Sequence, residues 1–275
     1  MQKGFKLKNK ICILGNNDIY TKMICKEFDD NKIDYTLIIE KKQMKEKTYF
    51  SKFCNIPLKL DSLLNTGKYK ALPKLNIFTI ELLIKDLLFK KSKRYKSIVD
   101  PFLNYIPKTN NIYYTPSVNH IKTSKLIKDL DLDIGVFGGV GIVDGLIIDE
   151  FNKFCINAHP APLPECRGGG ALENTLRYGL KPSVSVHFAT AEIDGGKIIK
   201  VTELLLSKDD SFNSVSFKLT ILCAKSLAKI IIGIQNDKAY QLIENNGKLH
   251  FWKDCNINIQ KIARDNLKRL LWKLA

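Results

Sequence analysis

The side chains best suited to chemistry in this 275-residue sequence are an amide, an imidazole and a carboxylate. Residues 154–157 have the apolar pattern of a buried strand, and strand alternation places Asn157 and His159 on one face at its carboxyl end. Asp194 follows in a tight turn, Ile193–Gly196. These groups suit direct acyl transfer without a serine or cysteine nucleophile. The amide can donate to a developing oxyanion, the imidazole can handle an amine proton, and the carboxylate can fix the imidazole tautomer.

The same residues also have a purely structural interpretation. Asn157 could cap a turn, and His159 could be a core histidine whose hydrogen bonds are satisfied. In open α/β sheets, however, ligands bind at the carboxyl ends of the strands, where this pair is expected. Three prolines then stiffen the loop that leads from His159 to Arg167. The residue types alone leave both interpretations open.

The elements around these residues follow a β-α-β pattern. A strand at 10–15, a helix to about Asp30 and a strand at Tyr35–Ile39 predict a doubly wound, Rossmann-like α/β sheet. A lysine-rich stretch at about 41–110, with a helix candidate at Thr79–Phe89, is interpreted as an inserted helical segment. Later strands are expected at Ile112–Thr115, Leu132–Phe137, Phe154–Asn157, Ser183–Thr190 and Lys197–Leu206; helices at Lys122–Leu130, Gly169–Tyr178, Phe212–Ile234 and Ile259–Leu274; and a small hairpin within Tyr240–Trp252. We therefore expect a catalytic domain at 1–208 and a small C-terminal helical extension at 209–275.

Several common site motifs are missing. The first strand leads into Gly-Asn-Asn-Asp instead of Gly-x-Gly-x-x-Gly, so a bound dinucleotide is not expected. The sequence contains no Gly-x-x-x-x-Gly-Lys-Ser/Thr phosphate loop and no Gly-x-Ser-x-Gly nucleophile motif. The four histidines do not have zinc-site spacing, so no metal is expected.

The charge of the chain suggests anionic partners. Lys and Arg number 44 against 28 Asp and Glu, a formal net charge of +16. Only five of the basic residues are arginines, and the lysines are spread along the chain, which favours a plain solvated surface over a nucleic-acid site.

The seven cysteines form no Cys-x-x-Cys pair, as for buried thiols in a reducing compartment. With no apolar signal segment or membrane-span run, the sequence predicts a cytoplasmic protein without a membrane partner.

Four sequence blocks, in order, carry a family resemblance. They are Asn157-x-His159-Pro160, Leu163-Pro164-x-x-Arg167-Gly168, Ser185–Phe188 and Asp194–Ile199. Over about residues 112–206, their order and spacing resemble the 10-formyltetrahydrofolate-dependent formyltransferases. The resemblance implies an enzyme with the formyltransferase fold, N10-formyltetrahydrofolate as co-substrate and no metal.

The resemblance also implies roles for individual residues. Asn157 would hold the formyl oxygen, His159 would stabilise the tetrahedral intermediate, and Asp194 would position His159 and help relay the proton. His187 would support Asp194. The folate would lie along two loops, contacting Phe137, Gly139, Val140, Gly141, Ile142, Val143, Thr190 and Ile193.

The resemblance leaves several candidates for the acceptor amine. The insertion and the helical pattern after residue 208 most resemble the nucleotide-sugar N-formyltransferases that serve bacterial surface polysaccharide (lipopolysaccharide) biosynthesis. An anionic amino sugar would then be the substrate, with Arg167, Pro162 and Lys108 contacting it. Methionyl-tRNA and glycinamide ribonucleotide formyltransferases are the alternatives, followed by a formyl-folate hydrolase and a nucleic-acid-binding protein. The last helix could pack on its own domain or on a second copy in a homodimer.

Overall fold

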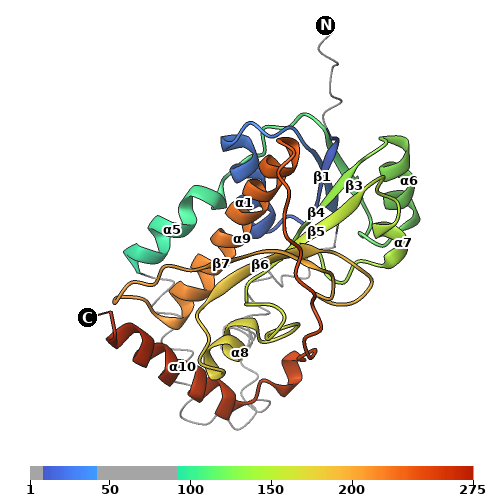
Figure 1. Ribbon diagram of the computed structural model, residues 1–275. Coiled ribbons are helices and arrows are strands. Elements are labelled where there is room, and N and C mark those ends of the chain that lie inside the picture. The colour runs from blue at the N-terminus through green and yellow to red at the C-terminus, as the bar shows by residue number, and fades with distance from the viewer. Residues whose placement is uncertain (1–8, 42–91, 275) are drawn as a thin grey trace, which may run out of the picture. The chain divides into compact units, whose positions relative to one another are not determined.

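A mixed sheet forms the centre of the computed structural model, which describes residues 9–41 and 92–274. Its seven strands lie in the order β3-β2-β1-β4-β5-β6-β7 (Figure 1). The first five strands of this order are parallel, and β6 and β7 are antiparallel to their neighbours. The strands are β1 Ile11–Gly15, β2 Thr36–Glu40, β3 Ile112–Thr115, β4 Ile134–Gly138, β5 Phe154–His159, β6 Ser183–Phe188 and β7 Ile198–Glu203. The predicted doubly wound α/β fold is confirmed.

Helices cover both faces of this sheet. The helices of this part are α1 Ile19–Asp30, α6 Ile121–Asp129, α7 Gly145–Ile148, α8 Ala171–Arg177, α9 Phe212–Gln235 and α10 Ile257–Trp272, with a 3-10 turn, η2, at Trp252–Asp254. Helix α9 packs on α1 and on β5 and β6. Cys12 and Leu14 of β1 instead share a buried cluster with Ile127 of α6 and Ile147 of α7. Because both faces are covered, every residue of β1 is buried.

The chain divides into two compact units, Met1–Lys42 with Ile106–Ala275, and Gln43–Tyr105. In the second unit the structure describes α5, Lys93–Leu103, whose first turn is capped by the Ser92 hydroxyl. The sequence did not predict this helix, and the candidate at 79–89 lies outside the described residues. Helices α9 and α10 both belong to the first unit, and the division into 1–208 and 209–275 stays a prediction. None of the described helices is long and apolar enough to span a membrane.

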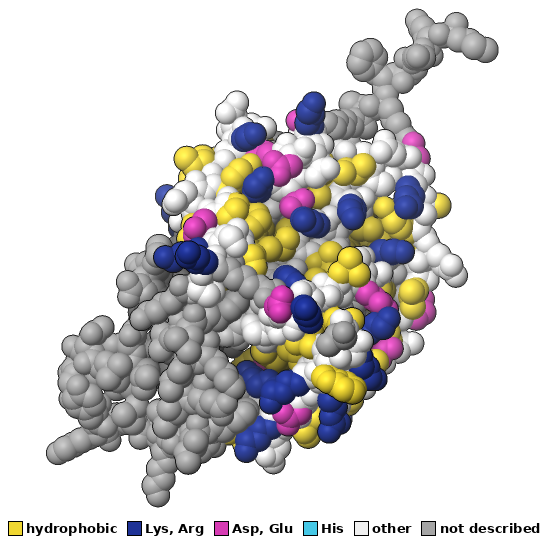
Figure 2. All heavy atoms as spheres, turned by 90° about the vertical axis from the view of Figure 1, so that its left-hand side faces the viewer, with side chains coloured by type: hydrophobic (Ala, Val, Ile, Leu, Met, Phe, Trp, Pro, Cys, Tyr) yellow, Lys and Arg dark blue, Asp and Glu magenta, His cyan; other side chains and the backbone are white. Residues whose placement is uncertain are grey.

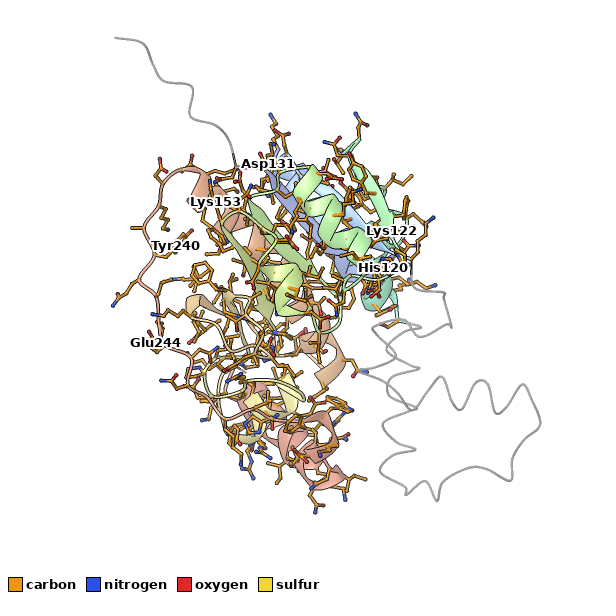
Figure 3. The ribbon with its side chains drawn as sticks, turned by 90° about the vertical axis from the view of Figure 1, so that its right-hand side faces the viewer. His120, Lys122, Asp131, Lys153, Tyr240 and Glu244 are labelled. Atoms are coloured by element: carbon orange, nitrogen blue, oxygen red, sulfur yellow. The ribbon has the colours of Figure 1, made fainter. Side chains whose placement is uncertain are left out.

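The predicted hairpin within Tyr240–Trp252 is wrong. The backbone of this segment pairs with other parts of the chain: Ile243 exchanges two hydrogen bonds with Ile198, the first residue of β7. His250 accepts from the Gly169 N–H and donates to the Arg167 carbonyl. We call residues 243–250 the strap. Figure 3 shows Glu244 on it, with Tyr240 just before it.

The basic surplus is distributed over the surface. In Figure 2, lysine and arginine side chains are interspersed with acidic and apolar ones on the face shown. Several lysines are paired, such as Lys10 with Asp131 at 2.9 Å and Lys197 with Glu244 at 2.7 Å. These exposed pairs contribute little to stability.

The start of α1 gives a prediction about stability. The Asp18 carboxylate caps the helix and accepts from the Thr21 N–H at 2.9 Å. Burial raises the pKa of Asp18 to about 6, although hydrogen bonds from Thr21, Asn16 and the Tyr20 backbone oppose the rise. Because the folded-state pKa is above the unfolded one, ionisation of Asp18 costs stability as the pH rises through about 6.

Replacing Asp18 by Asn removes this charge and keeps an accepting oxygen. The unfolding free energies of the variant and the wild type are compared at pH 4.5 and at pH 8. At pH 8 the variant should be more stable, relative to the wild type, by about 1–3 kcal/mol than it is at pH 4.5. Urea denaturation at the two pH values measures it. A difference that stays constant with pH would show that Asp18 does not carry the buried charge.

Candidate active site

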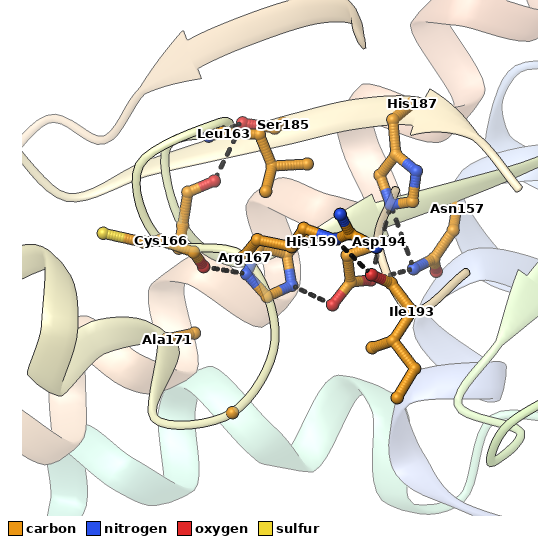
Figure 4. A network of polar contacts seen from close by, with 12 residues as sticks. Asn157, His159, Leu163, Cys166, Arg167, Ala171, Ser185, His187, Ile193 and Asp194 are labelled. Carbon is orange, nitrogen blue, oxygen red and sulfur yellow. Dashed lines mark hydrogen bonds and ion pairs between the residues drawn. The ribbon is translucent and has the colours of Figure 1, made fainter. Parts of the chain in front are cut away.

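The candidate catalytic residues lie on two adjacent strands and the turn that follows them. In the antiparallel pairing of β5 with β6, Asn157 is opposite His187 and His159 is opposite Ser185. Asp194 lies in the connection between β6 and β7, with a left-handed backbone conformation (φ 46°). The three predicted catalytic residues and His187 therefore come together at the carboxyl end of β5 (Figure 4).

The Asp194 carboxylate is the centre of this cluster. Its Oδ2 lies 3.3 Å from His159 Nδ1, and its Oδ1 accepts from Asn157 Nδ2 at 3.3 Å and lies 3.5 Å from His187 Nε2. Burial acts to raise the pKa of Asp194, but His159, His187 and the Gly168 N–H together hold this pKa well below its usual range. The carboxylate is therefore ionised at neutral pH and can stabilise a positive charge on either imidazole ring.

His159 lies between two hydrogen-bond acceptors. Its Nε2 lies 2.8 Å from the Cys166 carbonyl oxygen and its Nδ1 faces Asp194, so both ring nitrogens face acceptors. A neutral imidazole can donate to only one of them, whereas an imidazolium donates to both. Burial lowers the pKa of His159, against the opposing effects of Asp194 and the Cys166 carbonyl. The ring is thus neutral at neutral pH and can take up a proton between two waiting acceptors.

Asn157 is held less tightly than the two residues that it touches. Its Nδ2 lies 3.4 Å from His187 Nε2 in addition to the 3.3 Å contact with Asp194. His187 Nδ1 lies 2.8 Å from the Phe188 carbonyl oxygen, which assigns the ring proton of a neutral His187 to Nδ1 and makes Nε2 an acceptor. Both contacts of the Asn157 amide are longer than a typical N–H···O bond. One N–H can therefore turn to a ligand oxygen at small cost.

Ser185 anchors the loop that follows His159, a role that the sequence analysis missed. Its hydroxyl donates to the Ala161 carbonyl at 2.8 Å and accepts from the Leu163 N–H at 2.9 Å, in a fully buried position. The signal that could have identified it is its place on β6, two residues before His187 and on the same face. A hydroxyl buried on the face of the candidate site needs a partner there.

The predicted folate loop follows β4, the parallel neighbour of β5, so it lies at the same end of the sheet as Asp194. Val140 and Val143 are buried in the core, with Phe137 packed against it, whereas Gly141 and Ile142 are exposed. Asn119 fixes this loop, donating to the Ile142 carbonyl and accepting from the Asp144 N–H, both at 2.9 Å.

Gly139 has a left-handed conformation (φ 82°), and its carbonyl accepts from Asn16 Nδ2 at 2.9 Å. On the second loop, Thr190 and Ile193 are exposed. Contact of the first loop with a ligand would thus be mainly through its backbone. The folate-binding roles of both loops stay predictions.

The three residues predicted to bind the acceptor lie in different places. Pro162 is half-buried in the loop after His159, where its carbonyl accepts from the Cys166 N–H. Arg167 lies beside the cluster, but its guanidinium contacts the Asp194 turn: Nε donates to the Ile193 carbonyl at 2.6 Å and Nη2 pairs with Glu192 at 2.8 Å. A substrate contact of Arg167 stays a prediction.

The structure does not bring Lys108 to this site. Lys108 precedes the first residue of β3, which is parallel to β2, and its N–H donates to Asp29 near the end of α1 at 3.0 Å. Since β3 and β5 run in the same direction, Lys108 lies at the amino end of the sheet, opposite the end that carries His159. The sequence carried a signal for this, because Lys108 comes just before the predicted strand at Ile112–Thr115, and the residues before a parallel strand lie at its amino end.

No competing chemistry is evident among residues 9–41 and 92–274. No three His, Cys, Asp or Glu side chains gather there in a way that could hold a metal ion. Cys166 is the cysteine next to the cluster, and burial raises the pKa of its thiol to about 11, so the thiol stays protonated at neutral pH. The groups of this cluster that could act on a ligand are the Asn157 amide, the His159 imidazole and the Asp194 carboxylate.

One segment of the chain is similar to a known protein family. Residues 102–230 match the family described as formyl transferase. The methionyl-tRNA formyltransferase of Rickettsia prowazekii is 30% identical over 163 residues, which cover 52% of this chain and 54% of that protein. The enzyme of the same name from Buchnera aphidicola is 28% identical over 152 residues, covering 51% and 48%. The chain thus spans about half the length of the curated relatives it matches.

Solved structures share the fold at low sequence identity. A sugar N-formyltransferase from a Shewanella species has a TM-score of 0.55 at 14% identity, covering 94% of this chain and 87% of that one. The N-formyltransferase of Helicobacter canadensis, in complex with folinic acid and dTDP-3-aminofucose, has 0.53 at 15%, covering 94% and 80%. Glycinamide ribonucleotide transformylase 1 of Symbiobacterium toebii has 0.51 at 15%, covering 86% and 95%. By its sequence, the segment 102–230 is similar to the formyl transferase family, and the chain shares its fold with solved formyltransferases.

Proposed function

We propose that this protein is an N-formyltransferase that moves the formyl group of N10-formyltetrahydrofolate to the amine of a nucleotide-linked amino sugar. The observation that carries the proposal is the Asp194 carboxylate in contact with both His159 and Asn157. That arrangement joins a proton acceptor to an amide donor without a covalent nucleophile. It matches the needs of direct transfer between two nitrogen atoms.

In the proposed reaction the acceptor amine attacks the formyl carbon. A C–N bond forms, and the formyl oxygen becomes an oxyanion that accepts a hydrogen bond from the Asn157 amide. The proton that the amine loses reaches His159 Nδ1 by way of the Asp194 carboxylate that faces it, and Asp194 then stabilises the imidazolium. The proton then passes to N10 as the C–N10 bond breaks. The products are tetrahydrofolate and an N-formyl sugar, and no oxidant or reductant is needed.

The start of α1 bears on the choice of acceptor. In doubly wound folds the N-terminus of the first helix is a frequent phosphate site, because its free N–H groups and dipole attract anions. Here the Asp18 carboxylate accepts from the Thr21 N–H and from the Thr21 hydroxyl, and so occupies that position. This argues against a phosphorylated acceptor, such as glycinamide ribonucleotide, seated on α1. The phosphates of a nucleotide sugar would have to bind elsewhere.

The nucleotide-sugar acceptor is also supported by a known combination of ligands. The Helicobacter canadensis enzyme of the same fold binds folinic acid together with dTDP-3-aminofucose, a folate and a nucleotide-linked amino sugar. We propose the same two classes of ligand for this protein. Its product would be an N-formylated sugar for a surface polysaccharide.

Methionyl-tRNA is the second candidate acceptor. It is favoured by the curated relatives, which are methionyl-tRNA formyltransferases, and by the net charge of +16. The described residues after β7 form α9, the strap and α10, in the same unit as the sheet.

An acceptor panel separates the two. The protein is incubated with 10-formyltetrahydrofolate and, in turn, with dTDP- and UDP-linked amino sugars, glycinamide ribonucleotide and charged initiator methionyl-tRNA. Mass spectrometry then detects the formylated product, a gain of one CO. We expect formylation of at least one nucleotide-linked amino sugar. Formylation of methionyl-tRNA with none of the sugars would overturn the proposed acceptor and leave the proposed reaction intact.

A further inference from the structure

The turn that carries Asp194 is held from two sides by side chains from distant parts of the chain. We propose that Asn245, in the strap, and Arg167, in the loop after β5, are positioning residues that set the distance between Asp194 and His159. This inference rests on the proposed function, because it assigns the two residues a part in formyl transfer. Neither side chain would touch the reacting atoms.

The Asp194 turn needs external support. Asp194 has a left-handed backbone conformation, which a non-glycine residue rarely adopts without compensating contacts. Gly196 is pressed against β6, where a Cβ would overlap the Phe188 carbonyl. Apart from the Gly195 N–H, which donates to the Glu192 carbonyl, the turn closes few hydrogen bonds on itself. Its carbonyl groups are satisfied by side chains instead.

Arg167 holds the residue before Asp194. Its Nε donates to the Ile193 carbonyl, and its Nη2 pairs with Glu192. The residues on either side of Arg167 touch the catalytic pair directly: the Cys166 carbonyl lies against His159 Nε2, and the Gly168 N–H donates to the Asp194 carboxylate. One short segment therefore contacts the backbone of the turn and both His159 and Asp194.

Asn245 holds the turn from the other side. Its Nδ2 donates to the Asp194 carbonyl at 2.6 Å and to the Gly196 carbonyl at 3.0 Å, so both amide hydrogens are used. The residue is 5% exposed. A side chain buried to this extent, with both hydrogens on the backbone of a catalytic turn, is placed to position that turn.

The strap is itself anchored at both ends. Ile243 pairs with Ile198 of β7, and His250 pairs with the backbone at Arg167 and Gly169. Between them, Gly247 lies so close to the loop after His159 that a Cβ would overlap the Pro164 carbonyl. Through these contacts the strap connects the loop that follows His159 to the turn that carries Asp194.

The main test is Asn245→Asp, which keeps the shape of the side chain and removes both donated hydrogens. We expect kcat to fall about tenfold or more, because a small displacement of a catalytic group has effects of this size. The KM for formyl-folate should change by less than about twofold, since transition-state contacts affect kcat without changing KM. Asn246→Asp is the matched control: Asn246 is the exposed neighbour, and its variant should behave like wild type.

The pH dependence of Asn245→Asp distinguishes positioning from a general loss of structure. When protonated, the new carboxyl group can donate one hydrogen bond to the turn; when ionised, it donates none and repels both carbonyls. The ratio of variant to wild-type kcat should therefore rise as the pH is lowered. A ratio that does not change with pH, or a wild-type kcat in the variant, would overturn the assignment of Asn245.

Arg167→Lys provides an independent test, and it carries the proposal if Asn245→Asp does not fold. Lysine keeps the charge but cannot contact the Ile193 carbonyl and Glu192 through two nitrogens of one planar group. We expect kcat to fall while the KM of the acceptor stays within about twofold of wild type. A large rise in that KM with an unchanged kcat would instead assign Arg167 to substrate binding and overturn its positioning role.

A readout without turnover separates this inference from the proposed function. In ¹⁵N-histidine NMR, Asn245→Asp should change the His159 ring shifts and their titration, whereas Asn246→Asp should leave both unchanged. Wild-type protein that formylates no acceptor would refute the proposed function alone. His159 shifts that are identical in the Asn245 variant and the wild type would refute the positioning role alone.

Discussion

Replacing Asp194 by Asn is expected to lower kcat about 10²–10³-fold and to leave the protein folded. The carboxylate lies 3.3 Å from His159 Nδ1 and holds the positive charge that His159 acquires when it takes the amine proton. An amide of the same shape carries no charge, so the imidazolium loses this stabilisation in the transition state. The loss should appear in kcat at saturating acceptor and formyl-folate.

The matched control for this variant is Asp129→Asn, at the exposed end of α6, which should have wild-type kcat. Stability gives a second readout. The pKa of Asp194 is lower in the folded protein than in the unfolded chain, so its ionised form stabilises the fold above the unfolded pKa, and this contribution is lost as the pH falls through the folded value. Near-normal turnover by Asp194→Asn would show that the carboxylate takes no part in the reaction.

Replacing His159 by Ala should reduce kcat by at least about 10²-fold and change the pH dependence of kcat/KM. Burial lowers the pKa of His159 below the ordinary histidine value, so in the wild type the neutral, proton-accepting form persists to pH values below about 6.5. We expect the acidic limb of kcat/KM to have its midpoint below that value, and the limb to disappear from the residual activity of the variant.

His120→Asn is the control for His159. His120 caps α6 by accepting from the Lys122 N–H, far along the chain from the cluster, and asparagine can also accept at a helix start (Figure 3). The pH dependence of kcat/KM in His120→Asn should match that of the wild type. If the acidic limb persists unchanged in His159→Ala, another group takes the proton, and the assignment of His159 as the base is wrong.

Much of the fold could be predicted because its signals lie in contiguous residues. The apolar run before Gly15, the helix that ends at Asp30 and the strand at Ile112–Thr115 are bounded within a few residues of their place in the structure. The cluster could be predicted for a similar reason. Asn157 and His159 share one strand face, and Asp194 comes one strand later, in the next turn.

Features that depend on distant contacts could not be predicted. Asn245-Asn246-Gly247 has the composition of a hairpin turn, but the amide of Asn245 binds the Asp194 carbonyl 51 residues away. Gly247 is required by the carbonyl of Pro164 and not by a turn. The residues next to Asn245 and Gly247 in the sequence give no sign of these contacts. Arg167 is a similar case. A basic residue beside an expected anion site is predicted to contact the ligand, whereas in the structure its guanidinium contacts Ile193 and Glu192.

The most direct test of the central claim follows the formyl carbon itself. Wild-type protein is incubated with 10-formyltetrahydrofolate labelled with ¹³C in the formyl group and a mixture of nucleotide-linked amino sugars, and the label is traced by NMR and mass spectrometry. The proposed reaction predicts ¹³C in an N-formyl amide on a sugar, with one tetrahydrofolate formed for each amide, and loss of this product in Asp194→Asn. Label that appears only as free formate would show hydrolysis and contradict transfer to an amine.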